Sequence, residues 1–140
     1  PKNDPLDSVL ARMRRFASEV FEAKGIEGTL DFPKEAKYLR LDMGKRRHFY
    51  LLFKEAVNNL TKYSQCKKAH IGMEHRNGQL TMTVSDNGQG FVLEEKQDTG
   101  NGLQTMFHRA KILGGKLNIQ SAPGQGTTLS LTFPITQIRD

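Results

Sequence analysis

Apolar residues recur every three or four positions in three parts of the chain, which is the spacing of a buried face on an amphipathic helix. The first predicted helix covers residues 5–24, with Gly25 just beyond its end, and the second covers residues 45–64. A third follows Gly102 and stops at Gly114 and Gly115, since glycine commonly ends a helix. The positions expected to be buried are Leu6, Val9, Leu10, Met13, Phe16, Ala17, Val20 and Phe21 in the first helix, Phe49, Leu52, Phe53, Ala56, Val57 and Leu60 in the second, and Leu103, Met106, Phe107, Ala110 and Leu113 in the third.

Alternation of apolar and polar residues predicts strands at residues 69–75 and 79–85. Residues 76–78, with Asn77-Gly78 at their centre, are typical of a tight hairpin turn. Further strands are expected at residues 28–32, 116–121 and 127–133. Helices and strands that follow one another in this way favour a structure of two packed layers.

Length and composition indicate one globular domain. A chain of 140 residues can bury a substantial core, with residues 1–4 expected as a frayed lead and residues 135–140 as a tail. No apolar run approaches the ~20 residues of a membrane span, and Pro1 is not a natural start, so we interpret the chain as excised from a longer protein. The single cysteine, Cys66, excludes an internal disulfide and suits a reducing compartment.

The formal net charge of +6 raises the question of a nucleic-acid partner. The positive residues are scattered along the sequence, however, and are not interleaved with aromatic residues in a basic stripe. We therefore expect a solvated basic surface and no nucleic-acid binding. A nucleoside triphosphate is also a polyanion, so the sign of the charge fits a nucleotide ligand as well.

Residues 86–91, Asp-Asn-Gly-Gln-Gly-Phe, follow the predicted strand 79–85. The stretch places the Asp86 carboxylate beside a backbone that two glycines, Gly88 and Gly90, leave open to a ligand. Taken alone the pattern is weak, because an Asp-Asn-Gly turn between strands has the same composition. Features elsewhere in the chain decide between the two interpretations.

One such feature is a polar line on the second predicted helix. Glu55, Asn59 and Lys62 are spaced so that a carboxylate, an amide and an ammonium share one side of the helix. A solvated helix face is the usual explanation for such residues. Asn58 and Asn59 are nevertheless poor helix formers in mid-helix, which indicates that something other than helix propensity keeps them there.

A second glycine-rich stretch, Gly100-Asn101-Gly102-Leu103, opens the third predicted helix. Backbone amides and the helix dipole make such an N-terminus a general site for anions. The residues before it, 92–99, are polar and have no periodicity, so we expect a mobile loop that closes over bound phosphates.

These stretches resemble the boxes of the ATP-binding catalytic domain of two-component sensor histidine kinases, which belong to the GHKL ATPase superfamily. Residues 55–64 resemble the N box, residues 86–91 the G1 box, residues 100–103 the G2 box, and residues 124–128 the glycine-threonine motif that closes the site. The pattern from Gly102 to Gly124 is most similar to the subclass of nitrate sensors and membrane-fluidity sensors. The similarity spans residues 6–134 and implies a Bergerat-type α+β fold: a two-layer α/β sandwich with a mixed, mostly antiparallel sheet and helices on one face.

The resemblance also implies roles for individual residues. Glu55 is similar to the carboxylate that acts as a general base or orients the attacking histidine, and Asn59 to the amide that holds magnesium. Asp86 is similar to the acceptor for the amine of adenine. The other nucleotide-binding positions that it implies are Lys62, Tyr63, Gly88, Gly90, Gly100, Gly102, Leu103 and Thr127. This set agrees with the chemistry of ATP, which needs an anchor for the base, oxygen ligands for a hard cation and amides for phosphates.

Two departures from the family pattern stand out. Tyr63 occupies a position where this subclass usually has histidine. In addition, His48, His70, His75 and His108 all lie within the ATP-binding similarity, and none combines the flanking acidic residue with the helical context expected of a phosphoacceptor. The acceptor histidine is therefore expected on another domain.

The expected function is binding of ATP with magnesium and transfer of the γ-phosphoryl group to a histidine on the phosphoacceptor and dimerisation domain of the parent kinase. The resemblance implies a cytoplasmic domain, monomeric alone, whose homodimeric parent can be anchored in the inner membrane and passes its signal to a response regulator. Two alternatives remain open: another GHKL ATPase such as an anti-sigma serine kinase, and a degenerate nucleotide-binding or regulatory interaction module, which Tyr63 favours.

Overall fold

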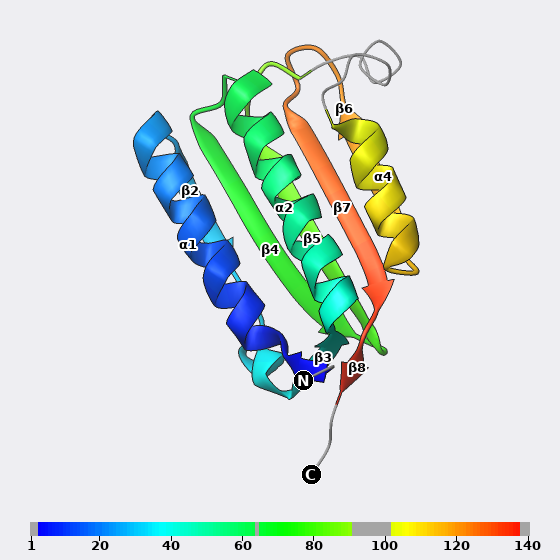
Figure 1. The fold of residues 1–140 in the computed structure, drawn as a ribbon. Coiled ribbons are helices and arrows are strands. Elements are labelled where there is room, and N and C mark those ends of the chain that lie inside the picture. Colours follow the sequence, from blue (N-terminus) through cyan, green and yellow to red (C-terminus); the bar gives the residue numbers. More distant parts are fainter. Residues whose placement is uncertain (1–2, 64, 91–101, 138–140) are drawn as a thin grey trace.

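The fold is built on a five-stranded sheet in the order β2-β4-β5-β7-β6 (Figure 1). The structure is a computed structural model that describes residues 3–63, 65–90 and 102–137. All neighbouring strands pair antiparallel except β2, which runs parallel to β4, so the sheet is mixed and mostly antiparallel as predicted. The strands are β2 (Glu27–Asp31), β4 (Lys68–Arg76), β5 (Gln79–Asp86), β6 (Lys116–Ser121) and β7 (Thr127–Pro134).

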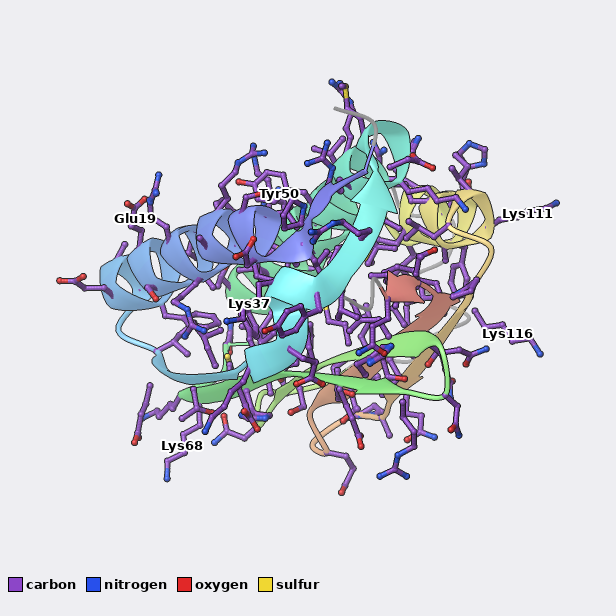
Figure 2. The ribbon with its side chains drawn as sticks, turned by 90° about the horizontal axis from the view of Figure 1, so that it is seen from below. Glu19, Lys37, Tyr50, Lys68, Lys111 and Lys116 are labelled. Atoms are coloured by element: carbon purple, nitrogen blue, oxygen red, sulfur yellow. The ribbon has the colours of Figure 1, made fainter. Side chains whose placement is uncertain are left out.

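Three α-helices of the described residues cover one face of this sheet (Figure 1). They are α1 (Leu6–Lys24), α2 (Met43–Tyr63) and α4 (Leu103–Ile112). A short 3-10 helix, η1 (Lys34–Tyr38), lies near the start of α1. Viewed from below, the helices form an upper layer and the sheet a lower one, which confirms the predicted two-layer arrangement (Figure 2). No helix of the described part is both long and apolar enough to cross a bilayer.

Local sequence explains where these elements begin and end. Gly25 ends α1 in the left-handed conformation, with φ of 68°, and its amide and that of Ile26 bond to carbonyls of the last turn. This is the glycine-dependent C-cap expected from the sequence. Asn77 and Gly78 both have positive φ, 53° and 76°, as a tight two-residue hairpin between β4 and β5 requires.

Apolar side chains from both layers form one core between helices and sheet. The tilted pair of Phe49 and Phe133, with ring centroids 5.1 Å apart, joins α2 to β7, and Phe16 packs edge-on against Phe53 between α1 and α2. Most positions predicted to be buried are buried. Phe107 of α4 is an exception, because its side chain is 38% exposed.

A second, smaller sheet corrects the predicted chain ends. It has the order β1-β3-β8 and is formed by β1 (Asn3–Pro5), β3 (Leu39–Asp42) and β8 (Thr136–Gln137). Residues expected in a frayed lead and in a tail thus pair with a strand that was not predicted. These strands have two to four residues each, too few for alternation to be recognised in a sequence.

Candidate functional site

Four segments that are distant in sequence meet at the upper end of the molecule in Figure 1. They are the end of α2, the start of α4, the end of β5 and the start of β7. The predicted functional residues that the structure describes lie on or next to these segments. The end of α2 carries Glu55 and Asn59, both partly exposed, and Lys62, which is exposed. The site is therefore assembled by the fold, with each contributing residue held on or next to a regular element.

Glu55 of α2 lies directly against the first residue of the α4 region. Gly102 precedes α4 with φ of 87°, and a Cβ on this residue would overlap the carboxylate Oε1 of Glu55. Only glycine satisfies both the positive φ and the close approach. The contact brings the carboxylate of the predicted N box to the positive end of the α4 dipole, where negative charge is stabilised.

Helices α2 and α4 are also connected farther from this contact. Arg109 of α4 lies with Nη1 2.9 Å from Nδ1 of His48 on α2. A guanidinium can only donate, so His48 must accept and be neutral at this nitrogen. Burial, assisted by the charges of Arg109, His108 and Arg47, lowers the pKa of His48, which favours the neutral form. The bond therefore helps to fix α4 beside the helix that carries Glu55.

Asp86 is the last residue of β5, and its carboxylate is held by the backbone. Its Oδ1 accepts a hydrogen bond from the amide of Gly88 at 2.7 Å, and the amide of Thr127, its cross-strand partner, also donates to the carboxylate. Burial raises the pKa of Asp86, while these two hydrogen bonds act in the opposite direction. A carboxylate has about four acceptor positions, so Asp86 is oriented and can still accept from a ligand.

Two glycines let the segment after β5 pack against the turn before β7. A Cβ on Gly90 would overlap the carbonyl oxygen of Ala122, and a Cβ on Gly126 would overlap that of Asp86. Both glycines have positive φ, 69° and 75°. The predicted G1 stretch and the predicted glycine-threonine turn thus form one continuous backbone wall.

Two residues that the sequence analysis did not single out support this wall. The Asn87 side-chain oxygen accepts hydrogen bonds from the amides of Lys67 and Lys68, at 3.0 and 2.9 Å, and so ties the end of β5 to the start of β4. The Ser121 hydroxyl lies 2.8 Å from that of Thr127. Their partners are distant in sequence or on a neighbouring strand, so only the predicted strand pairing could have pointed to them.

Several predicted site residues add little or lie outside the described residues. Leu103 is the first residue of α4, and its side chain is buried in the core. Only its backbone could therefore contribute to the site. Gly100, the expected loop 92–99 and the side chain of Tyr63 are outside the described part of the chain. Their roles stay predictions.

The oxygen atoms on α2 suit a hard cation. Asn59 offers an amide oxygen, a ligand type that a hard cation accepts, one helical turn from the Glu55 carboxylate. The described residues contain no cluster of three or more His, Cys, Asp or Glu. Magnesium commonly uses only one or two protein ligands beside phosphate oxygens, so the available oxygens fit a cation held together with a nucleotide.

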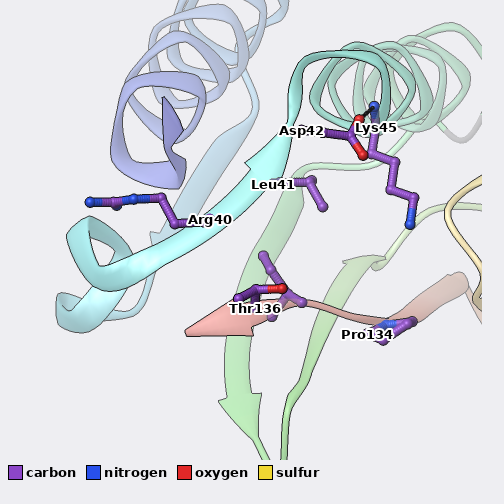
Figure 3. A pocket seen from close by; sticks show the side chains of 7 residues that line it. Arg40, Leu41, Asp42, Lys45, Pro134 and Thr136 are labelled. Carbon is purple, nitrogen blue, oxygen red and sulfur yellow. Dashed lines mark hydrogen bonds between the residues drawn. The ribbon is translucent and has the colours of Figure 1, made fainter. Parts of the chain in front are cut away.

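A hollow of about 230 Å³ lies at the other end of α2, between β3 and β8 (Figure 3). Its carboxylate, Asp42, accepts a hydrogen bond from the amide of Lys45 at 2.9 Å and thereby caps α2. Asp42 is thus explained by helix capping.

Comparisons with known proteins agree with this geometry. A family model described as histidine kinase-, DNA gyrase B- and HSP90-like ATPase matches residues 44–137. The signal transduction histidine-protein kinase/phosphatase DegS of Brevibacillus brevis is 29% identical over 128 residues, which cover 91% of this chain and 33% of DegS. The sensor histidine kinase LiaS of Bacillus subtilis (strain 168) is 28% identical over 106 residues, 76% of this chain and 29% of LiaS. The chain thus spans about a third of the length of these curated relatives.

Among solved structures, the histidine kinase AdeS of Acinetobacter baumannii superposes with a TM-score of 0.76. The aligned part covers 95% of this chain and 66% of that chain at 16% identity. At this identity the similarity concerns the fold, and it confirms the predicted α+β sandwich.

Proposed function

Because the chain belongs to the family of histidine kinase-, DNA gyrase B- and HSP90-like ATPases, we propose that it binds ATP with magnesium and transfers the γ-phosphoryl group to a histidine of a phosphoacceptor domain. The observation that carries this proposal is the contact between the Glu55 carboxylate and Gly102. It joins an acid suited to proton transfer with a helix start suited to phosphate, two groups that phosphoryl transfer needs close together.

Asp86 anchors the base in this proposal. Its carboxylate is oriented by the amides of Gly88 and Thr127 and accepts a hydrogen bond from the exocyclic amine of adenine. Guanine presents a carbonyl oxygen at the equivalent position, which a carboxylate repels. The wall formed by Gly90 and Gly126 lets the backbone approach the base without side chains in the way.

Asn59 and Lys62 handle the charge of the triphosphate. Asn59 supplies an amide oxygen to magnesium, and Lys62 places an ammonium near the phosphates. Bound magnesium neutralises negative charge on the phosphates and fixes their geometry. Gly100, Gly102 and Leu103 hold the phosphates through their backbone, and Tyr63 lies next to Lys62 in the position that is usually histidine in similar kinases.

Glu55 takes part in the transfer itself. Its carboxylate extends from α2 and lies beside the start of α4, where it can accept the proton of an attacking histidine or orient the imidazole. The acceptor histidine lies on the dimerisation domain of the parent protein, and the phosphate then passes to a response regulator. The named relatives are a sensor histidine kinase and a histidine-protein kinase/phosphatase, which supports this assignment.

Substitution of Glu55 tests the proposal. Glu55→Gln is expected to keep its affinity for magnesium-ATP but to slow phosphoryl transfer by roughly 10²–10⁴-fold, the usual effect of losing a general base. The assay measures acid-labile phosphate on the phosphoacceptor domain of the parent, added in trans. Glu19→Gln, an exposed glutamate on α1, is the matched control and should transfer at the wild-type rate (Figure 2).

Two outcomes contradict the proposal in different ways. If the wild-type chain binds magnesium-ATP but never phosphorylates the acceptor domain, it is a nucleotide-binding regulatory module and not a kinase. If it phosphorylates serine on a partner, the chain is a serine kinase of the same superfamily.

A further inference from the structure

A second hollow, of about 390 Å³, lies far from the candidate nucleotide site at the end of α2 and the start of α4. It is formed between the first half of α1 and the segment that leads into η1, at the lower end in Figure 1. Its size is within the ~300–1,000 Å³ range of ligand pockets. It is lined by Asp7, Leu10, Ala11, Arg14, Phe32, Pro33, Lys34, Ala36 and Lys37.

The floor of this hollow, which we call the α1–η1 hollow, is apolar. Leu10 and Ala36 are buried, and Phe32 is partly buried beside them. The Arg14 guanidinium lies 4.8 Å from the centre of the Phe32 ring. A guanidinium over an aromatic face is attracted by the electrons of the ring, which limits its motion. The hollow therefore offers an apolar bottom and a fixed cationic group at its edge.

The rim of the hollow is basic. Arg14, Lys34 and Lys37 are exposed there, and Asp7 is the one carboxylate in the lining. No ion pair within the described residues involves any of the three cations. They can therefore pair with carboxylates from outside at no cost of breaking an existing ion pair.

None of the residues that the family model matches lines this hollow. The family match begins at residue 44, whereas every lining residue precedes it. The three cations border one compact hollow and do not follow a groove along which a nucleic-acid backbone could run. The apolar face of α1 is buried in the core, so this helix has no free apolar face to insert into a membrane.

We propose that the α1–η1 hollow is a docking site for a short acidic segment of a partner protein. One apolar side chain of the segment enters the hollow over Leu10 and Ala36, and carboxylates on either side of it pair with Arg14, Lys34 and Lys37. A contact of this size is small for a protein interface, so the expected affinity is micromolar. The site is independent of nucleotide binding, and its ligand can bind while ATP is bound.

The test uses synthetic peptides in which a central leucine, phenylalanine or methionine is flanked by glutamate and aspartate. Binding of fluorescein-labelled peptides to the 140-residue chain is measured by anisotropy. The triple variant Arg14→Gln, Lys34→Gln, Lys37→Gln is expected to bind the best peptide about tenfold more weakly, the sum of modest losses from exposed ion pairs. Ala11→Gln fills the hollow without changing the charge and is expected to weaken binding as well.

The matched control removes three exposed cations elsewhere, by Lys24→Gln, Lys111→Gln and Lys116→Gln. Figure 2 shows Lys111 and Lys116 at the right edge of the view, away from Lys37, which lies nearer the middle. This variant should bind the peptide like wild type, and all variants should keep the wild-type affinity for magnesium-ATP. The proposal is overturned if no peptide binds saturably, or if the control variant loses as much peptide affinity as the triple variant. It is also overturned if peptides without the apolar residue bind equally well, or if DNA or phosphatidylserine vesicles bind the hollow in preference to the peptides.

Discussion

At the scale of single residues, the site combines groups that are costly for folding. Asp86 is a carboxylate whose burial raises its pKa, and Asn59 is a poor helix former near the end of a long helix. Folding stability therefore does not explain why these two residue types occupy these positions. Such conflicts between local preference and fold are expected where residues are kept for binding or chemistry.

Asn59 can be tested against its neighbour. Asn59→Ala should weaken binding of magnesium-ATP, because the phosphates lose a cation held in place by the amide oxygen. Asn58, the adjacent residue, is exposed, whereas Asn59 is partly buried. Asn58→Ala is therefore a control with the same gain in helix propensity, about 0.5 kcal/mol, and should leave the affinity unchanged. Calorimetry with and without magnesium makes the comparison; equal effects of both substitutions would exclude Asn59 as a magnesium ligand.

The raised pKa of Asp86 predicts that the stability of the folded protein depends on pH. Because its pKa is raised in the folded protein, the folded state bears an unfavourable charge at neutral pH, and Asp86→Asn should raise Tm there. The gain should shrink as the pH falls through the raised pKa and vanish below the ordinary value of 3.8, where folded and unfolded states are both protonated. Thermal unfolding of both proteins across this pH range is the measurement. A gain that grows toward acidic pH would contradict this sign.

The same substitution should lower nucleotide selectivity. Wild type is expected to prefer ATP to GTP by roughly 10²-fold, since a buried polar mismatch is costly. The asparagine amide can donate to the guanine carbonyl, so Asp86→Asn should narrow this ratio.

At the scale of elements, the contact between α2 and α4 depends on Gly102. Gly102→Ala forces a Cβ into the Glu55 carboxylate and a strained φ of 87°, so α4 must shift away from α2. Gly78→Ala is a matched control, because Gly78 of the β4–β5 hairpin has a similar φ of 76° but no atom within 4 Å of an added Cβ. The control should lose only about 1–2 kcal/mol of stability from backbone strain. Gly102→Ala should lose more and should also bind magnesium-ATP more weakly; identical losses would mean that the Glu55 contact is unimportant.

The elements themselves were largely predictable. The helix stripes, the Asn77-Gly78 hairpin and the glycine C-cap at Gly25 are local signals, and the structure confirms them. Pairing between distant segments was not predictable, because it leaves no periodic trace. The small sheet β1-β3-β8, the parallel alignment of β2 with β4 and the anchoring of Lys67 and Lys68 by Asn87 are examples.

The same division applies to the site. Motifs were enough to single out Glu55 and Asp86 as candidates, since their chemistry fits ATP, and their roles stay predictions. The close approach of Glu55 to Gly102 could not be predicted, because it depends on how α4 packs against α2. Likewise, Phe107 has the right spacing for a buried residue, but α4 lies at the edge of the helix layer and leaves it exposed.

At the scale of the whole molecule, site and core depend on the same packing between layers. Phe49 is fully buried and packs on Phe133, so Phe49→Ala should cost about 3–5 kcal/mol, a large part of the ~5–15 kcal/mol that stabilises a typical domain. Phe107→Ala, at an exposed position, should cost much less. Because ATP binds only the folded site, magnesium-ATP at about 100 times its Kd should restore ~2.7 kcal/mol to Phe49→Ala. Thermal unfolding with and without nucleotide measures both effects. If nucleotide stabilises wild type but leaves the Tm of Phe49→Ala unchanged, the cavity left by the phenylalanine ring has disrupted the nucleotide site itself. Packing between the two layers would then affect binding more directly than the linkage between folding and binding requires.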